Sequence, residues 1–134
     1  MFRVALVVLA VAACALPAIA RTACHAPRGT HVTLFGGVDD PDVLVWDSKD
    51  RLVRYSGGSA DTRQFLLPHA LLGRPGTKAV VVSCSTGAVH PKFGAQDADA
   101  VGVMILSGKY RGRYGWVSSG DVHGAGVLEA RDAW

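Results

Sequence analysis

The chain has 134 residues, a formal net charge of +3 and a hydrophobic fraction of 49%. This length excludes a multidomain enzyme, a TIM barrel and a dinucleotide-binding domain with a partner domain. The apolar fraction excludes a disordered chain, and the weak, unclustered positive charge argues against a nucleic-acid partner. Sixteen glycines beside one glutamate favour short strands joined by glycine turns, so we expect a mainly β fold.

Residues 1–20 have the features of a secretory signal peptide. Arg3 provides a positive charge, an apolar run follows over residues 4–16, and Ala18-Ile19-Ala20 fits a small-residue cleavage site. The run is shorter than the roughly 20 residues that a transmembrane helix needs. We therefore predict a periplasmic or secreted protein with no membrane span. The rest of the chain is then a single β domain at 21–124 and a C-terminal tail at 125–134.

Three cysteines bear on this prediction in different ways. Cys14 ends a stretch, Val11 to Cys14, that resembles a bacterial lipobox, so a lipid anchor at Cys14 is the alternative to cleavage after Ala20. Cys24 and Cys84 remain in the mature chain, and in an oxidising compartment they are expected to form a disulfide. The alternative is a thiol or metal protein that uses these two cysteines. The histidine spacing fits no metal motif, so we predict no metal ion and no cofactor.

The first half of the domain is predicted to contain a strand, a hairpin and a helix. His31–Phe35 is the strand, and Val43–Trp46 pairs with Leu52–Tyr55 across the polar loop 47–51. The helix is predicted from Thr62 to about Leu67, with Asp61 as its cap and Gln64 completing a capping box. Because Pro68 is unfavourable inside a helix, a last turn over His69–Leu72 would follow a kink.

The second half is predicted to be all β. A central apolar strand at Ala79–Cys84 is followed by a long irregular loop over residues 85–100. A hairpin then joins Val101–Leu106 to Arg113–Ser118 through a glycine-containing turn, and a short strand at Asp121–His123 ends the domain.

Residues 101–123, VGVMILSGKYRGRYGWVSSGDVH, carry a resemblance to a known fold family. Gly115-Trp116-Val117, two serines and Asp121-Val122 resemble the closing segment of bacterial SH3-like domains. The glycine turn before them is similar to the KOW variant of that small barrel. The resemblance implies an elaborated SH3-like barrel with one short helix, in which a one-turn 3₁₀ step leads to the last strand. It also implies binding, to a peptidoglycan fragment or to an envelope protein.

The resemblance places the ligand surface on the aromatic and basic residues of this hairpin. Aromatic rings stack on flat groups, and cationic side chains bind the carboxylates that cell-wall peptides carry. Trp116 has an alternative interpretation, because a strand tryptophan in a small domain is often core. The candidate ligand-binding residues are Lys109, Tyr110, Arg111, Arg113, Tyr114 and Trp116.

No catalytic motif is present, so we predict a protein that is not an enzyme but a binding module of the bacterial envelope. The alternative is a periplasmic inhibitor of a hydrolase such as a lysozyme or an amidase. Such an inhibitor would insert the loop 85–100 into the enzyme's cleft, with Lys92 or Asp97 reaching in.

Overall fold

The computed structural model describes Cys24, residues 27–91 and residues 96–124. The predicted signal peptide, Cys14 and the predicted tail lie outside these residues. The elements, in chain order, are β1 (His31–Leu34), β2 (Val43–Trp46), α1 (Lys49–Gly57), α2 (Ala60–Leu66), a 3₁₀ turn (Leu67–His69), β3 (Ala70–Gly73), β4 (Thr77–Val89), β5 (Ala98–Ile105), β6 (Tyr114–Ser118), a second 3₁₀ turn (Ser119–Asp121) and β7 (Val122–His123).

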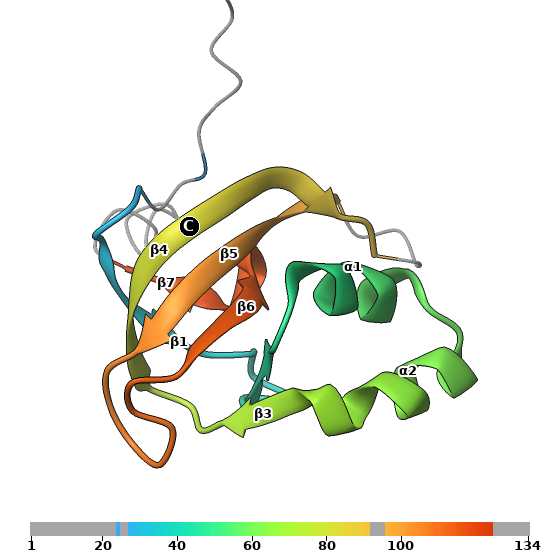
Figure 1. Cartoon of the computed structure of the whole chain (residues 1–134), viewed down its shortest axis with the longest axis horizontal. Coiled ribbons are helices and arrows are strands. Elements are labelled where there is room, and N and C mark those ends of the chain that lie inside the picture. The colour runs from blue at the N-terminus through green and yellow to red at the C-terminus, as the bar shows by residue number, and fades with distance from the viewer. Residues whose placement is uncertain (1–23, 25–26, 92–95, 125–134) are drawn as a thin grey trace, which may run out of the picture.

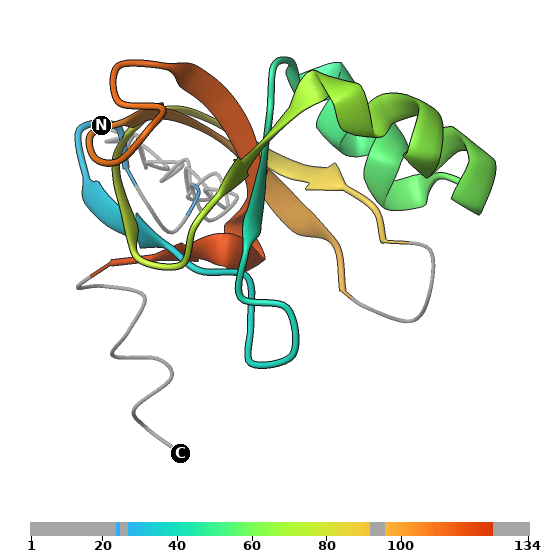
Figure 2. The ribbon, with the colours of Figure 1, turned by 90° about the horizontal axis from the view of Figure 1, so that it is seen from below.

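The seven strands form one antiparallel sheet in the order β3-β2-β6-β5-β4-β1-β7. The sheet curls into a half-barrel, and α1 and α2 lie together on one side of it (Figures 1 and 2). The prediction of a mainly β small barrel is confirmed.

Two hydrophobic cores lie on opposite faces of the same strands. Val43 and Val45 of β2 belong to the core inside the barrel, whereas Trp46 belongs to a second core beneath the helices. Trp46 is only 1% exposed, and Leu52 of α1 packs in the same cluster. Because β2 is covered on both faces, its sequence is a continuous apolar run and does not alternate.

Strand β4 is long enough to contribute side chains to both cores. Val81 near its start is in the barrel core, and Val89 at its end is in the helical core. Its pairing with β5 shifts register between Val81 and Ser83 and again between Ser85 and Val89, as expected of a strand that bends. The predicted strand at Ala79–Cys84 is confirmed but extends further, and residues 85–89 and 98–100 of the predicted loop 85–100 belong to β4 and β5.

The predicted hairpin strand at Leu52–Tyr55 is wrong, because these residues lie in helix α1. Ser48 caps the helix, and its Oγ accepts a hydrogen bond from the backbone N–H of Arg51 at 3.2 Å. Arg51 forms an ion pair with Asp47, four residues earlier. The residues interpreted as a polar hairpin loop are therefore the start of a capped helix.

The predicted second helix is confirmed as α2, with a different cap and a different end. Ser59 caps it and accepts a hydrogen bond from the Thr62 N–H at 3.4 Å, whereas Asp61 lies in its first turn. The helical turn predicted over His69–Leu72 is wrong. After Pro68 in the 3₁₀ turn, Ala70 to Gly73 form β3, whose hydrogen bonds to β2 replace those of a helix.

The end of the domain follows the predicted order. The hairpin β5–β6 is followed by the 3₁₀ turn at Ser119–Asp121 and then by the short strand β7, which is the order of elements expected for residues 101–123. Cys24 and Cys84 form the predicted disulfide, which links Cys24 to strand β4 over a sequence separation of 60 residues. Among the described residues, no helix is both long and apolar enough to cross a membrane.

Replacing Ser48 by alanine tests the assignment of α1. We expect Ser48→Ala to lower the free energy of unfolding by about 1 kcal/mol, because the Arg51 N–H loses its acceptor. Chemical denaturation measures the change. Ser83→Ala, at an exposed position of β4, is the matched control and should change stability by less than about 0.5 kcal/mol. Equal effects of the two substitutions would contradict the cap.

Candidate binding site at one end of the barrel

The structure divides the six predicted ligand-binding residues among four environments. Lys109 and Tyr110 line a cavity at one end of the barrel, and Arg113 and Tyr114 line a second, smaller cavity. Arg111 is exposed in the turn between β5 and β6 and lines neither. Trp116 is half-buried and packs against the core beneath the helices. The six residues therefore do not form one pocket, and their role in binding stays a prediction.

The cavity at the barrel end, called here the end pocket, has a volume of about 450 Å³. It lies between the turn that joins β3 to β4 and the turn that joins β5 to β6. Its lining residues are Leu72, Gly73, Arg74, Thr77, Ile105, Ser107, Gly108, Lys109 and Tyr110. An apolar cavity with a few polar groups is the usual form of a ligand site in a small domain.

Hydrogen bonds hold the β5–β6 turn at the pocket. The backbone N–H of Gly112 donates to the Ile105 carbonyl at 2.8 Å, and the N–H of Arg111 donates to the Gly108 carbonyl at 3.3 Å. Gly108 and Gly112 have φ values of 78° and 86°, a conformation that favours glycine. The predicted glycine turn is thus built by these two residues.

A second set of hydrogen bonds ties this turn to the start of β4. The Lys78 N–H donates to Ser107 Oγ at 2.8 Å, and the Leu106 N–H donates to the Lys78 carbonyl at 2.7 Å. These bonds fix the spacing of the two turns, so the width of the end pocket is set by the hydrogen bonds that the Lys78 backbone makes with Leu106 and Ser107.

The charge of the end pocket is positive. Arg74 and Lys109 are its charged lining residues, and no carboxylate is among that lining. The Lys109 ammonium lies 5.3 Å from the centre of the Tyr110 ring, within the range of a cation–π contact. Tyr110 also packs against the barrel core, so the ring is held from below. The pocket thus combines an apolar floor with two cations, which suits a carboxylate attached to an apolar group.

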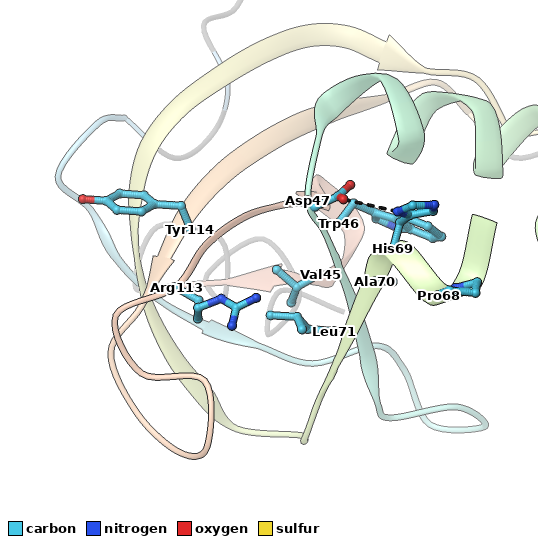
Figure 3. Close-up of a pocket in the computed structure, with 9 residues that line it drawn as sticks. All are labelled: Val45, Trp46, Asp47, Pro68, His69, Ala70, Leu71, Arg113 and Tyr114. Atoms are coloured by element: carbon cyan, nitrogen blue, oxygen red, sulfur yellow. Dashed lines mark ion pairs between the residues drawn. The ribbon is translucent and has the colours of Figure 1, made fainter.

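The second cavity, of about 150 Å³, lies where β2, β3 and β6 meet (Figure 3). Figure 3 shows the Arg113 guanidinium directed toward Val45 and Leu71, whereas the Tyr114 ring points away from the cavity. Tyr114 is 67% exposed. Its position on the same face as Trp116 was predictable from strand alternation, but the helices cover only the tryptophan.

Asp47 is the acidic group of this second cavity. Its carboxylate accepts a hydrogen bond from the Arg51 guanidinium at 2.6 Å. The same carboxylate lies 3.5 Å from His69 Nδ1 (Figure 3). The hydrogen bond from Arg51 lowers the pKa of Asp47 below its ordinary value of 3.8, with a smaller contribution from His69.

The residues of the alternative functions are placed as follows. Lys92 lies outside the described residues, and Asp97 Oδ1 lies 2.9 Å from His90 Nδ1. This pair joins the two ends of the loop that the inhibitor hypothesis would insert into a cleft. Cys24 and Cys84 are joined to each other, so neither offers a free thiol in this structure.

Sequence reasoning found Lys109 and Tyr110 of the end pocket but missed Leu72 and Arg74. The missing information was which strands pair. If the strand at Ala79–Cys84 is paired with the strand that begins at Val101, the start of β4 lies beside the turn at 107–110, and Leu72 and Arg74 just before β4 lie near that turn.

The ion pair between Asp47 and Arg51 predicts a pH effect. A carboxylate with a lowered pKa stabilises the fold above its unfolded pKa, and this stabilisation is lost as the pH falls through the folded pKa. We expect Arg51→Ala to raise the pKa of Asp47 toward 3.8. It should also cost about 0.5 kcal/mol of stability at neutral pH and progressively less below about pH 4.

A carboxyl-carbon NMR titration and denaturation at several pH values measure these changes. Arg54→Ala is the matched control, because Arg54 lies on the same helix and its distance to Asp50 is 3.9 Å. An unchanged Asp47 titration in Arg51→Ala would contradict the assignment.

Comparison of the chain with protein-family models, with curated proteins and with solved structures found no match.

Proposed function

We propose that this protein is an exported, non-enzymatic binding module of the bacterial envelope. Its ligand is a carboxylate-bearing peptide group, from the cell wall or from an envelope protein, and its site is the end pocket.

The observation that carries the proposal is the composition of the end pocket. Two cations, Arg74 and Lys109, lie at a cavity whose other walls include Leu72, Ile105 and the Tyr110 ring. A peptide carboxylate next to an apolar side chain matches both features, because the cations bind the charge and the apolar walls bind the neighbouring group.

Two further features support export and binding. The signal-peptide pattern of residues 1–20 and the Cys24–Cys84 disulfide are both typical of proteins in oxidising compartments. The resemblance of residues 101–123 to bacterial SH3-like domains favours recognition of a peptide, and two of the residues it indicated, Lys109 and Tyr110, lie in the end pocket.

Co-sedimentation of the mature protein with peptidoglycan sacculi tests the cell-wall form of the proposal. We expect Lys109→Ala and Arg74→Ala each to weaken binding roughly five- to tenfold, as loss of one charge-assisted hydrogen bond does. Binding should also weaken as salt rises, because the contacts are solvent-accessible.

Lys78→Ala is the matched control. Lys78 lies at the same end of the barrel, but its ammonium donates to Thr33 Oγ1 at 2.9 Å and it does not line the pocket. If all three substitutions weaken sacculi binding equally, the loss reflects the protein's overall positive charge and not a specific site at the end pocket. Binding that survives the double substitution of Arg74 and Lys109 would place the site elsewhere.

A further inference from the structure

Strand β3 has an open edge. In the described part of the chain it is the terminal strand of the sheet and pairs only with β2. The sheet's other terminal strand, β7, has only two residues and so offers a much shorter edge.

The register shows which backbone groups β3 presents to this edge. Ala70 pairs with Trp46, and the Asp47 N–H donates to the His69 carbonyl at 3.2 Å. In an antiparallel pair, hydrogen-bonded and non-hydrogen-bonded positions alternate. Leu71 and Gly73 therefore direct their N–H and C=O groups to β2, and Leu72 directs both of its groups outward.

Ala70 adds one more acceptor to the edge. Its C=O is outward by the same alternation, whereas its N–H is used in a hydrogen bond to the Leu67 carbonyl. The edge thus offers one donor and two acceptors in the spacing of a β-ladder.

The side chains beside these backbone groups offer a ligand both an apolar contact and positive charge. Leu72 is 56% exposed, an unusual position for a leucine at a sheet edge. Arg74 lies two residues further along the chain, and Leu72, Arg74 and Lys109 all line the end pocket. An open row of backbone groups, an exposed apolar side chain and a pair of cations are therefore contiguous.

We propose that the ligand of this module is an extended segment of a partner protein that adds to the sheet as a strand beside β3. The residue opposite Leu72 exchanges backbone hydrogen bonds with it and carries an apolar side chain. The residue two positions away is acidic, because alternate side chains of a strand share a face, and its carboxylate meets Arg74 and Lys109. This inference rests on the proposed function and specifies its partner.

The probe is a fluorescein-labelled heptapeptide with threonine at its four odd-numbered positions. Valine occupies the central position, and the other two even-numbered positions hold one valine and one glutamate. Two methylated forms make a matched pair. A methyl group on the amide nitrogen of the central valine removes a hydrogen bond to Leu72. The same methyl group on the neighbouring threonine faces away from β3.

We expect fluorescence polarisation to show binding of the parent peptide and a loss of at least tenfold on methylation at the central valine. Methylation at the neighbouring threonine should cost less than about threefold. Hydrogen exchange of the Leu72 amide should slow when the peptide is bound. Arg74→Ala should weaken binding by roughly five- to tenfold. Replacing the peptide's glutamate by glutamine should cost less in that variant than in the unsubstituted protein, because only Lys109 then remains to bind the carboxylate.

Equal effects of the two methyl groups, or an unchanged exchange rate at Leu72, would overturn the strand-addition proposal. Sacculi binding that depends on Arg74 and Lys109, together with no peptide binding, would also overturn it while leaving the proposed function standing. Failure of both ligands would reject both proposals.

Discussion

The double burial of strand β2 is the constraint on which the rest of the structure depends. Val43 and Val45 complete the barrel core, and Trp46 in the same strand anchors the helices. The strand joins β6 through one register pair, Trp46 with Trp116. Trp46 is the largest fully buried side chain of the core that joins the helices to the barrel, and its burial alone removes enough apolar surface to contribute several kcal/mol.

Glycine makes this junction possible. A Cβ at Gly115 would collide with Val45 Cγ1, so the absence of a side chain there lets β2 approach β6. Trp116 of β6 is the register partner of Gly102 in β5, and a Cβ at Gly102 would lie at van der Waals distance, 3.4 Å, from the Trp116 ring. Lys49, the first residue of α1, places its ammonium 5.9 Å from the centre of that ring. The aromatic residue that the sequence suggested as a ligand contact is thus part of the attachment of the helices.

The candidate site follows from the same arrangement. In the sequence, α1 and α2 come between β2 and β3. The chain therefore returns from the helices as the terminal strand of the sheet, with one edge uncovered (Figure 1). The following turn then brings Arg74 to the β5–β6 turn, where Lys109 and Tyr110 lie. The pocket, its two cations and the open edge therefore all follow from one feature of the topology: two helices are inserted in the sequence between strands that are neighbours in the sheet.

The sequence predicted most of this architecture, and its errors have physical causes. Strands with β-branched runs and glycine turns, such as those around Gly108, were predictable from local preferences. The segment Leu52–Tyr55 was not, because its apolar residues fit a strand as well as one turn of a helix. The evidence for the helix was in Ser48 and in the four-residue spacing of Asp47 and Arg51.

The site was predictable only in part. A turn with lysine, arginine and tyrosine can be recognised in a sequence, and it led to Lys109 and Tyr110. Leu72 and Arg74 come from a segment more than thirty residues earlier, and their proximity depends on the pairing of β4 with β5. Local sequence preferences carry no information on that pairing.

The most direct test of the account is an amide-resolved NMR titration of the ¹⁵N-labelled mature protein with muropeptides and, separately, with the glutamate-containing heptapeptide. The account predicts that at least one of these ligands shifts amides concentrated at residues 72–77 and 107–110, on the two sides of the end pocket. Shifts concentrated instead around Asp47 and His69, or no shift with either ligand, would contradict it.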